Sequence, residues 1–330
     1  MTRIDHCIEE YRDWCSKLGI VTISDMNRII SEGRINWLIN VSEIWQEQKI
    51  SEMAKEIKDN IDRKKIILIS GPSSSGKTSF ANRLQLHLKV LGIGALAISL
   101  DDYYLPKELI PLDEKGEHDL ETIEAIDYEH FNRDVEALIE GMEVGLPIFD
   151  FKISRPREEV RKVTLASNEV IIVEGIHGLN PKLTSNIDDS KKFKIYCSAL
   201  TALRQDDGTK INSRTTRLIR RLIRDNFFRG TSPAETLARW QSVEEGAAKH
   251  IYPFTDNADI IFNSSLLYEH CVYKVYLNEF LFGMKEGSSG YETIHELLEL
   301  INKFKLIDRE VVPKTSLVRE FVGGSTLIEQ

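Results

Sequence analysis

Eight residues form the spacing Gly-x-x-x-x-Gly-Lys-Thr, which runs from Gly71 to Thr78. They follow an apolar run at 66–70 and precede a helical pattern, the context in which this loop binds phosphate. Its glycines let the backbone wrap a phosphate, and amides at the helix N-terminus point at the anion. The lysine would neutralise β- and γ-phosphate oxygens, and the threonine hydroxyl would hold Mg²⁺. We predict an ATP site made of Gly71, Ser73, Ser74, Ser75, Gly76, Lys77, Thr78 and Ser79.

Two further apolar runs each lead into a carboxylate. Asp101 follows the run 95–100 and is the first of two aspartates, and Glu174 follows the run 170–173. In an open parallel sheet, the carboxyl ends of the strands face the ligand crevice. We predict that Asp101 accepts the proton of an acceptor hydroxyl, and that Glu174 joins Thr78 in holding Mg²⁺. The alternatives are that the paired aspartates cap a turn, and that the glutamate ends its strand by chance.

The third chemical feature is an arginine-rich stretch at 213–230, with six arginines against one aspartate. On a helix, four of these arginines share one face because they lie at i, i+3, i+4 and i+7. Guanidinium groups suit the oxygens of a transferring phosphoryl group, so we predict a lid over ATP at about 213–231. Arg217 and Arg220 would assist Lys77 in catalysis, while Arg224 and Arg229 would bind ATP. A solvated basic face and RNA binding are the alternatives.

Short β-type runs and helical stretches alternate through the middle of the chain, which predicts an α/β fold. We expect a P-loop NTPase core whose parallel sheet is flanked by helices, at 64–265. A helical extension at 1–63 precedes it, with helix stops at Gly19 and Gly33. Two helices around a GSSG break at 287–290 and a tail follow it, at 266–330. The predicted strands are 66–70, 95–100, 146–151, 170–173, 193–197 and 259–262.

Composition excludes several classes of protein. The 330 residues are 42% hydrophobic and 29% charged, which is ordinary for a globular chain and unlike a disordered one. The net charge of -9 argues against indiscriminate binding to nucleic acid or to an anionic membrane. Four widely spaced cysteines do not suggest a disulfide framework or a zinc site. With no secretory signal and no membrane-length apolar run, we expect a cytoplasmic protein.

Together these segments resemble the uridine kinase/phosphoribulokinase family of P-loop kinases, over about residues 64–265. LDDYY at 100–104 is similar to the family's D-S-[FY]-Y motif, and this implies that Asp101 is the general base and Tyr104 a substrate-side aromatic. DLETIEAID at 119–127 resembles the family's D-x-D-H-P-x-A-x-D. This resemblance implies that Glu121 stands at the position of the family's aspartate that binds ribose hydroxyls. By the same resemblance Glu174 is the metal-linked glutamate, and 216–225 is the arginine-rich helix and lid.

The sequence departs from the family at the segment that reads the base. The family's [VI]-Y-D-F stands here as Ile148-Phe149-Asp150-Phe151, and the histidine expected after it is absent around Ile153-Ser154-Arg155. A site without a polar reader loses power to choose one base. The residues expected to contact the acceptor are Asp101, Tyr104, Glu121, Phe149 and Arg217.

The resemblance implies transfer of the γ-phosphoryl group of Mg·ATP to a hydroxyl of a uridine- or cytidine-like nucleoside. A second reading is the same chemistry on a sugar phosphate, pantothenate or glycerate, with Arg155 and Arg157 able to bind an anionic acceptor or to lie solvated in a loop. A third is an ATP-gated, RNA-associated binding module with little turnover. A small alcohol is the expected partner, without nucleic acid or membrane, and the sequence leaves a homo-oligomer open.

The flanking segments resemble a bacterial nucleoside kinase-like group whose N-terminal part is similar to threonyl-tRNA synthetase accessory domains. About 63 residues precede the kinase core here, too few to hold those domains complete. The tail carries SLVREFVGGS, with Arg319, Glu320, Gly323 and Gly324. We expect it to fold back onto the core in a packing role.

Overall fold

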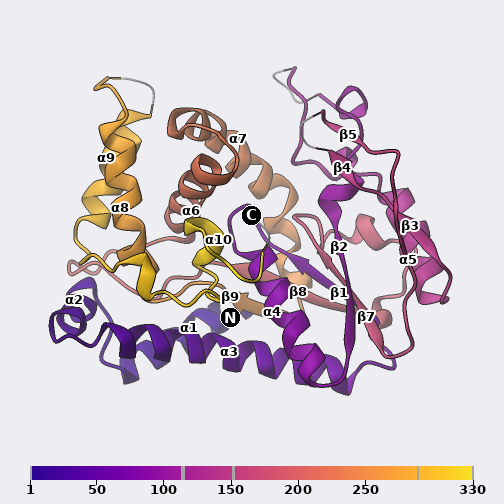
Figure 1. The fold of residues 1–330 in the computed structure, drawn as a ribbon, viewed down its shortest axis with the longest axis horizontal. Coiled ribbons are helices and arrows are strands. Elements are labelled where there is room, and N and C mark those ends of the chain that lie inside the picture. Colours follow the sequence, from indigo (N-terminus) through magenta and orange to yellow (C-terminus); the bar gives the residue numbers. More distant parts are fainter. Residues whose placement is uncertain (1, 113–115, 151–152, 288–289, 329–330) are drawn as a thin grey trace.

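The core of the computed structural model is a five-stranded, wholly parallel sheet in the order β2-β7-β1-β8-β9 (Figure 1). The structure describes residues 2–112, 116–150, 153–287 and 290–328. The α/β fold with a parallel sheet flanked by helices is thereby confirmed, together with five of the six predicted strands. These are β1 Ile66–Ser70, β2 Gly94–Ser99, β7 Glu169–Glu174, β8 Lys192–Ser198 and β9 Ile260–Asn263.

Alternating residues of β1 face two different clusters, so helices cover both faces of the sheet. Ile67 and Ile69 belong to a large apolar cluster that includes residues of α3 (Ile35–Asp59), α4 (Lys77–Val90) and α8 (Glu269–Phe282). Ile66 and Leu68 belong to a smaller cluster with residues of α5 (Tyr128–Ile139). A strand whose two faces are both buried reads as a continuous apolar run, which explains the sequence IILIS.

The N-terminal helices are α1 (Arg3–Lys17), α2 (Ile23–Ser31) and α3, and they lie along one side of the molecule in indigo (Figure 1). The predicted stops are confirmed, because Gly19 and Gly33 adopt φ values of 68° and 74°. Buried residues of all three helices join the same apolar cluster as the sheet. This region is therefore packed into the core.

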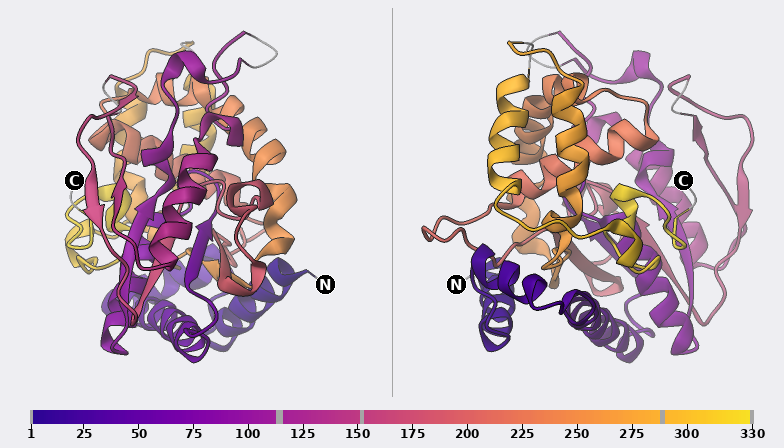
Figure 2. Two further views of the ribbon diagram at one scale, coloured as in Figure 1. Left: turned by 90° about the vertical axis from the view of Figure 1, so that its right-hand side faces the viewer. Right: turned by 60° about the vertical axis from the view of Figure 1, so that its left-hand side comes forward.

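The C-terminal half adds a group of helices beside the sheet, seen in orange in Figure 2. Chain segment 266–330 contributes α8 and α9, joined at a GSSG break whose Ser288 and Ser289 lie outside the described residues. The chain then returns toward α4 and ends in yellow near the middle of the molecule (Figure 1). The helices of this half are α6 Ser213–Phe228, α7 Pro233–His250, α8 Glu269–Phe282, α9 Tyr291–Ile301 and α10 Arg319–Val322.

The predicted strand at 146–151 is wrong as a member of the parallel sheet. Its residues instead enter two separate antiparallel pairs, β3 with β6 and β4 with β5. Pro147 lies between β3 and β4, and proline cannot donate a hydrogen bond to a continuous ladder. Phe151 lies outside the described residues. The four short strands are β3 Val144–Leu146, β4 Phe149–Asp150, β5 Arg155–Pro156 and β6 Arg161–Val163.

None of the helices in the described part of the chain combines the length and apolar character needed to span a bilayer.

Candidate functional site

The phosphate loop connects β1 to α4, and its backbone shape requires glycine at two positions. A Cβ atom on Gly71 would lie 2.1 Å from the Cys197 carbonyl oxygen, so any larger residue would displace the neighbouring strand. Gly76 and Ser74 adopt φ values of 88° and 61°. The Nζ atom of Lys77 lies across the loop and donates to the Gly71 carbonyl at 2.8 Å. The loop thus forms a ring of backbone groups ahead of α4.

Polar side chains of this loop and of the first turn of α4 are available to a ligand. The hydroxyl groups of Ser74, Ser75 and Ser79 are buried and have no hydrogen-bond partner among the described residues. Buried polar groups are normally paired, so such a cluster indicates a missing partner rich in hydrogen-bonding oxygens. The amides at the N-terminus of α4 add a favourable field for an anion. This arrangement fits the phosphates of a nucleotide.

Glu174 at the end of β7 stands next to this loop. In the sheet it is in register with Ile69 of β1 and with Ser99 of β2, so three strand ends meet here. Burial raises the pKa of Glu174 to about 7, opposed by the charge of Lys77 and by a hydrogen bond with Thr78. A carboxylate beside a hydroxyl is the oxygen-rich pair that Mg²⁺ prefers.

The pair does not make a metal site on its own. Within the described residues no group of three His, Cys, Asp or Glu side chains is placed to hold a metal ion. Mg²⁺ needs about six oxygen ligands and commonly takes several from water and substrate phosphates. Thr78 and Glu174 therefore fit an ion that arrives with a nucleotide.

The two aspartates after β2 have different surroundings. Asp101 is exposed, and its backbone amide donates to Ser99 Oγ at 3.3 Å. Asp102 is partly buried, accepts a hydrogen bond at Oδ1 from the Phe149 amide at 3.2 Å, and has its pKa raised by burial. The Asp101 carboxylate is thus open to a ligand, whereas the Asp102 carboxylate holds the adjacent β4. Asp101 keeps its predicted place, and Asp102 acquires a positioning role.

Tyr104, Phe149 and Glu121 gather close to Asp101. The rings of Tyr104 and Phe149 lie 6.0 Å apart, and the Tyr104 hydroxyl donates to the Leu120 carbonyl at 3.0 Å. Burial raises the pKa of the Tyr104 hydroxyl, and the negative charges of Asp101 and Glu121 raise it further. All three side chains therefore lie in one region. The structure therefore brings together the predicted acceptor residues from separate loops.

Glu121 is the most unusual of these residues. Helix α7 packs directly on it, since a Cβ atom on Gly246 would come within 2.5 Å of the Glu121 side chain. Burial raises its pKa to about 7, while the charges of Arg221 and Lys77 act in the other direction. Its Oε2 atom is buried without a hydrogen-bond partner in the part of the chain that the structure describes. A ligand hydroxyl would satisfy that oxygen.

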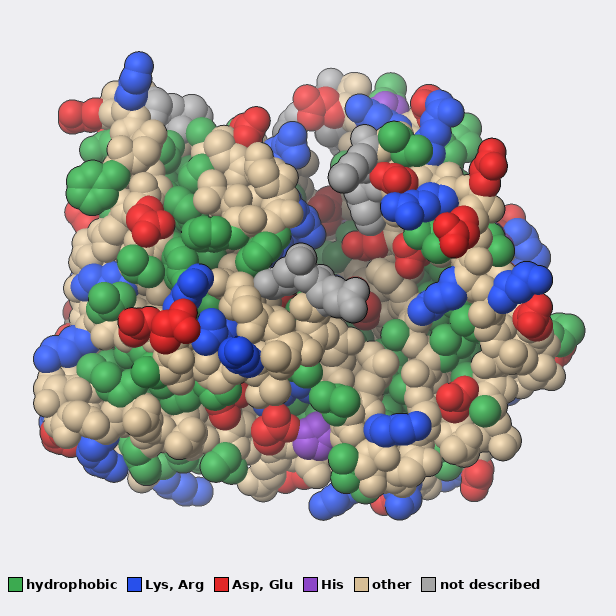
Figure 3. Space-filling model, viewed as in Figure 1, with side chains coloured by type: hydrophobic (Ala, Val, Ile, Leu, Met, Phe, Trp, Pro, Cys, Tyr) green, Lys and Arg blue, Asp and Glu red, His purple; other side chains and the backbone are tan. Residues whose placement is uncertain are grey.

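The face seen in Figure 3 is hollowed between the α6–α7 side and the side of the short strands, and acidic and basic side chains line the hollow. On the α6 side, Arg217 is buried and donates from Nε to the Ser73 carbonyl at 2.9 Å. Its other nitrogens contact Tyr252 at 2.7 Å and Glu244 at 2.9 Å. Arg221 donates to the Ser73 hydroxyl at 2.9 Å. Helix α6 is thereby tied to the phosphate loop.

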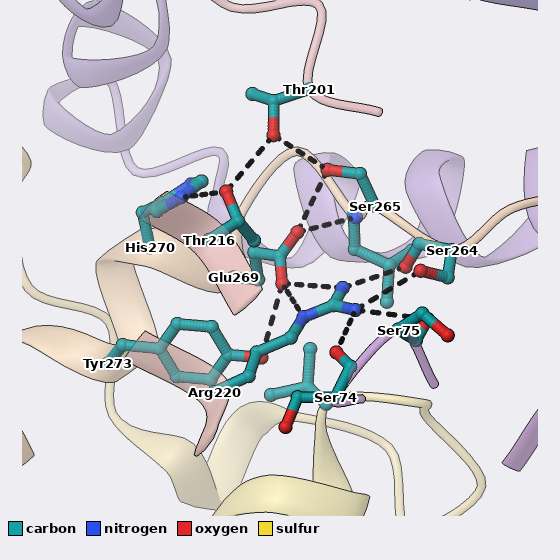
Figure 4. A network of polar contacts seen from close by, with 12 residues as sticks. Ser74, Ser75, Thr201, Thr216, Arg220, Ser264, Ser265, Glu269, His270 and Tyr273 are labelled. Carbon is teal, nitrogen blue, oxygen red and sulfur yellow. Dashed lines mark hydrogen bonds and ion pairs between the residues drawn. The ribbon is translucent and has the colours of Figure 1, made fainter. Parts of the chain in front are cut away.

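Arg220 has a different environment from the one predicted for a catalytic arginine. It is fully buried and forms an ion pair with buried Glu269 at 2.7 Å (Figure 4). The same guanidinium donates to the Ser264 carbonyl at 2.9 Å and reaches the backbone of Ser75 at 3.4 Å. Its hydrogen-bonding capacity is directed at protein atoms behind the loop. These contacts place Arg220 as a support of the phosphate loop, and its predicted part in balancing charge at the phosphoryl group stays a prediction.

Arg224 and Arg229, predicted to bind ATP, converge with Arg221 on a single carboxylate. Asp225 lies 3.1 Å from Arg224, 3.2 Å from Arg221 and 3.7 Å from Arg229. Three positive charges around one negative charge leave a local positive excess beside the phosphate loop. The structure therefore keeps both arginines near the predicted ATP site, held by Asp225.

Comparison with known proteins agrees with this geometry. Residues 66–266 match the Phosphoribulokinase / Uridine kinase family. The chain belongs to this family. Membership implies a kinase that uses ATP, and the phosphate loop described above lies within the matched residues. The resemblance seen in the sequence is confirmed at this level. The similarity of the N-terminal helices to synthetase domains stays a prediction, because the match begins at residue 66.

Several relatives carry the name uridine kinase. The chain is 30% identical to the uridine kinase of Bacillus pumilus over 201 residues, covering 59% of this chain and 84% of that protein. It is also 30% identical to the uridine kinase of Saccharomyces cerevisiae over 204 residues, which cover 60% of this chain but only 36% of the yeast protein. Among solved structures, D-glycerate 3-kinase from Cryptococcus neoformans aligns with 83% of this chain and 88% of its own, at 14% identity and a TM-score of 0.34.

Two arginines offered for an anionic acceptor pair with surface carboxylates in this family member. Arg155 lies 2.8 Å from Glu108, and Arg157 lies 3.3 Å from Asp150. Both guanidinium side chains are more than half exposed. This arrangement favours the alternative that they are solvated loop residues.

The sequence reasoning missed groups that act on the kinase site from a distance. Glu244 and Tyr252 hold Arg217, Glu269 holds Arg220, and Glu320 of the tail contacts the start of α4. For the first three no local pattern in the sequence points to a partner. For Glu320, the tail sequence SLVREFVGGS is a signal, but by itself it predicts only that the tail packs on the core.

Proposed function

We propose that this kinase transfers the γ-phosphoryl group of Mg·ATP to a hydroxyl of a neutral, hydroxyl-rich acceptor, with a uridine- or cytidine-like nucleoside as the first choice. The observation that carries the proposal is Glu121, a buried carboxyl group with an unpartnered oxygen beside the phosphate loop. A buried acceptor of this kind costs free energy until a donor pairs with it. A ribose hydroxyl is such a donor, and it would bring a second hydroxyl toward Asp101.

The transfer is an in-line displacement at the γ-phosphorus. The acceptor oxygen forms a bond to phosphorus, the bond to the β,γ-bridging oxygen breaks, and Asp101 takes the acceptor's proton. Lys77 and the arginines near the loop, Arg217, Arg224 and Arg229, offset the charge on the phosphoryl oxygens. Bound Mg²⁺, held by Thr78 and Glu174, would polarise the phosphates.

The charges of the acceptor side support a neutral acceptor. Asp101, Glu121 and Asp119 act together on the Tyr104 hydroxyl, whereas Lys77, Arg217 and Arg221 lie toward the phosphate loop, and Arg155 and Arg157 are paired with other carboxylates. An acceptor that carries its own phosphate or carboxylate would meet this negative field. Sugar phosphates and glycerate are thus disfavoured against nucleosides. Phe149 in place of the family's tyrosine leaves the choice of base broad.

The test is an ATP-consumption assay with a panel of acceptors, followed by detection of the phosphorylated product. The panel contains uridine, cytidine, adenosine, ribulose 5-phosphate, pantothenate and glycerate, and Lys77→Ala is the control without phosphate binding. We expect product from the pyrimidine nucleosides and from none of the anionic compounds. Turnover confined to an anionic acceptor would overturn the nucleoside assignment. Salt-sensitive RNA binding that changes with ATP, with no phosphorylated product, would overturn the enzyme.

A further inference from the structure

The C-terminal tail lies against the phosphate loop, far outside the family-matched residues. After α9 the chain returns across the molecule and reaches α4, as the yellow ribbon in Figure 1 and the right-hand view of Figure 2 show. Residues 316–322 are all buried. Leu317 packs on Gly76, because a Cβ atom there would come within 2.9 Å of the leucine side chain. Further along, Asn82 of α4 donates to the Leu327 carbonyl at 2.9 Å.

One tail residue contacts the amides that open α4. The Ser79 amide donates to Glu320 Oε2 at 3.1 Å, in a buried position. The next amide, that of Phe80, is already bonded to the Gly76 carbonyl within the helix. Ser79 therefore provides one of the N-terminal amides that a helix leaves for an anion. A carboxylate from 241 residues away occupies it.

The carboxylate is delivered by a fixed segment. Arg319 anchors the short helix α10, donating to the Val312 carbonyl at 2.7 Å and to the Arg309 carbonyl at 2.8 Å. Phe321 packs under the guanidinium of Arg220, which is the arginine that supports the loop from behind. The charge of Glu320 also acts on Glu174, so this tail residue reaches the metal side of the site.

Ligand phosphate and Glu320 cannot share this amide. Ser74 and Ser75 of the loop and Ser79 of the first turn of α4 carry buried hydroxyls that have no partner among the described residues, an independent sign that an oxygen-rich ligand binds here. Two anions at one helix N-terminus repel each other, and one N–H donates well to one acceptor. We propose that Glu320 is a residue of the nucleotide site that competes with a phosphate group for the Ser79 amide, so that the tail sets the affinity for nucleotide. This inference rests on the proposed use of ATP.

The first experiment measures binding by isothermal titration calorimetry on the whole chain, with Glu320→Gln compared with the wild type. The variant keeps the shape of the side chain and removes its charge. We expect about tenfold tighter binding of MgADP and of tripolyphosphate, since a charged hydrogen bond gives way to a neutral one. Adenosine, which has no phosphate, should bind equally to both proteins. Unchanged or weaker binding of the phosphate compounds would overturn the proposal.

The matched control is Glu310→Gln, which removes the same charge from an exposed position in the same C-terminal region. Its affinity for tripolyphosphate should equal that of the wild type. A gain as large as that of Glu320→Gln would indicate a general charge effect and would overturn the local competition.

The second experiment needs no variant and so does not depend on how well one folds. Hydrogen exchange of residues 316–324 in the wild-type protein is followed with and without tripolyphosphate. We expect faster exchange when phosphate displaces Glu320, and no change with adenosine. Exchange that is unchanged or slower on binding tripolyphosphate would overturn the proposal.

The two proposals fail in different ways. A chain that binds MgADP without phosphorylating any acceptor would overturn the proposed kinase function and leave the competition standing. An active kinase whose Glu320→Gln variant binds tripolyphosphate like the wild type would overturn only the competition.

Discussion

The nucleotide side of the hollow is built from regular elements, whereas the acceptor side is carried by loops and very short strands. On the nucleotide side, the loop between β1 and α4 is braced by Arg217 and Arg220 from α6 and by the tail. On the acceptor side, Asp101 and Tyr104 follow β2 in a turn, and Phe149 belongs to a two-residue strand. The nucleotide side is thus held by contacts from several helices, and the acceptor side by short segments.

This difference matches the chemistry that each side performs. Every substrate pair of such a kinase contains the same triphosphate, so rigid support for it suits all acceptors. The acceptor varies between members of a family, and loops tolerate the changes that alter a substrate pocket. The departure at Phe149 lies on the loop side, while the spacing of the phosphate loop is intact. Variants on the two sides should therefore fail in different measurements.

The largest expected effect separates chemistry from nucleotide binding. Asp101→Asn should lower kcat by about 10³- to 10⁴-fold, because a carboxamide cannot take the acceptor's proton. The Kd for MgATP should stay within about twofold, since the predicted role of Asp101 is in the transfer step and its side chain is exposed. Stopped-time product assays measure kcat, and calorimetry measures the Kd for MgATP. Near-wild-type turnover would remove Asp101 as the base.

The second effect tests the brace of the nucleotide side. Arg220→Met should lower the free energy of unfolding by about 3–5 kcal/mol, because Glu269 would be left as an unpaired buried charge. Urea unfolding followed by circular dichroism measures it. The control is Arg214→Met, an arginine on the same helix with a half-exposed side chain, for which we expect a loss of about 1 kcal/mol or less. Equal losses in the two variants would contradict a special role for Arg220.

The third effect concerns the buried acid of the acceptor side. Glu121 has a pKa of about 7 in the folded protein and an ordinary pKa of 4.5. Between these values the folded state holds the extra proton, so this group's contribution to stability is lost as the pH rises through 7. Between pH 5 and pH 8, the free energy of unfolding should fall by about 2 kcal/mol more in the wild type than in Glu121→Gln. Urea unfolding at both pH values measures the difference.

The control for this pH effect is Glu159→Gln, which changes an exposed glutamate in a loop. It should keep the full pH dependence of the wild type. A Glu121→Gln variant that also keeps it would show that Glu121 titrates normally.

The smallest effect sharpens the acceptor assignment. Arg155→Gln combined with Arg157→Gln should change the free energy of unfolding by about 1 kcal/mol or less, because both ion pairs are exposed. For a neutral acceptor the KM should change by about twofold or less. Initial-rate kinetics with the acceptor found in the panel decide the question. A rise in KM of about tenfold would indicate that the acceptor is anionic.

Much of the fold could be predicted because its signals are local. The strands of the parallel sheet are continuous apolar runs, and Gly19 and Gly33 end their helices at positive φ. The run at 146–151 failed because an apolar stretch does not reveal its partner strand. Pro147 interrupts it, and the pieces pair with neighbours in a loop region.

The arginine helix shows where local prediction stops in the site. Its four arginines share a face by spacing alone, and the sequence predicted catalysis for Arg217 and Arg220 and ATP binding for Arg224. Packing divides them, since Arg217 meets Glu244 of α7 and Arg220 meets buried Glu269 of α8, while Arg221 and Arg224 pair with Asp225 on the same helix. Spacing on one helix predicts pairs within that helix, whereas the partners of Arg217 and Arg220 depend on which helices pack beside it.

The sequence by itself determined the phosphate loop, the sheet that carries it and the carboxylates at two strand ends. Each follows from adjacent residues, through backbone freedom at glycines, alternation of burial and the chain direction of parallel strands. Only the tertiary structure decided that Glu121 is buried under α7, that Arg220 supports the loop and that Glu320 reaches the Ser79 amide. Those contacts join segments far apart in the chain, and burial and charge pairing arise when such segments pack together.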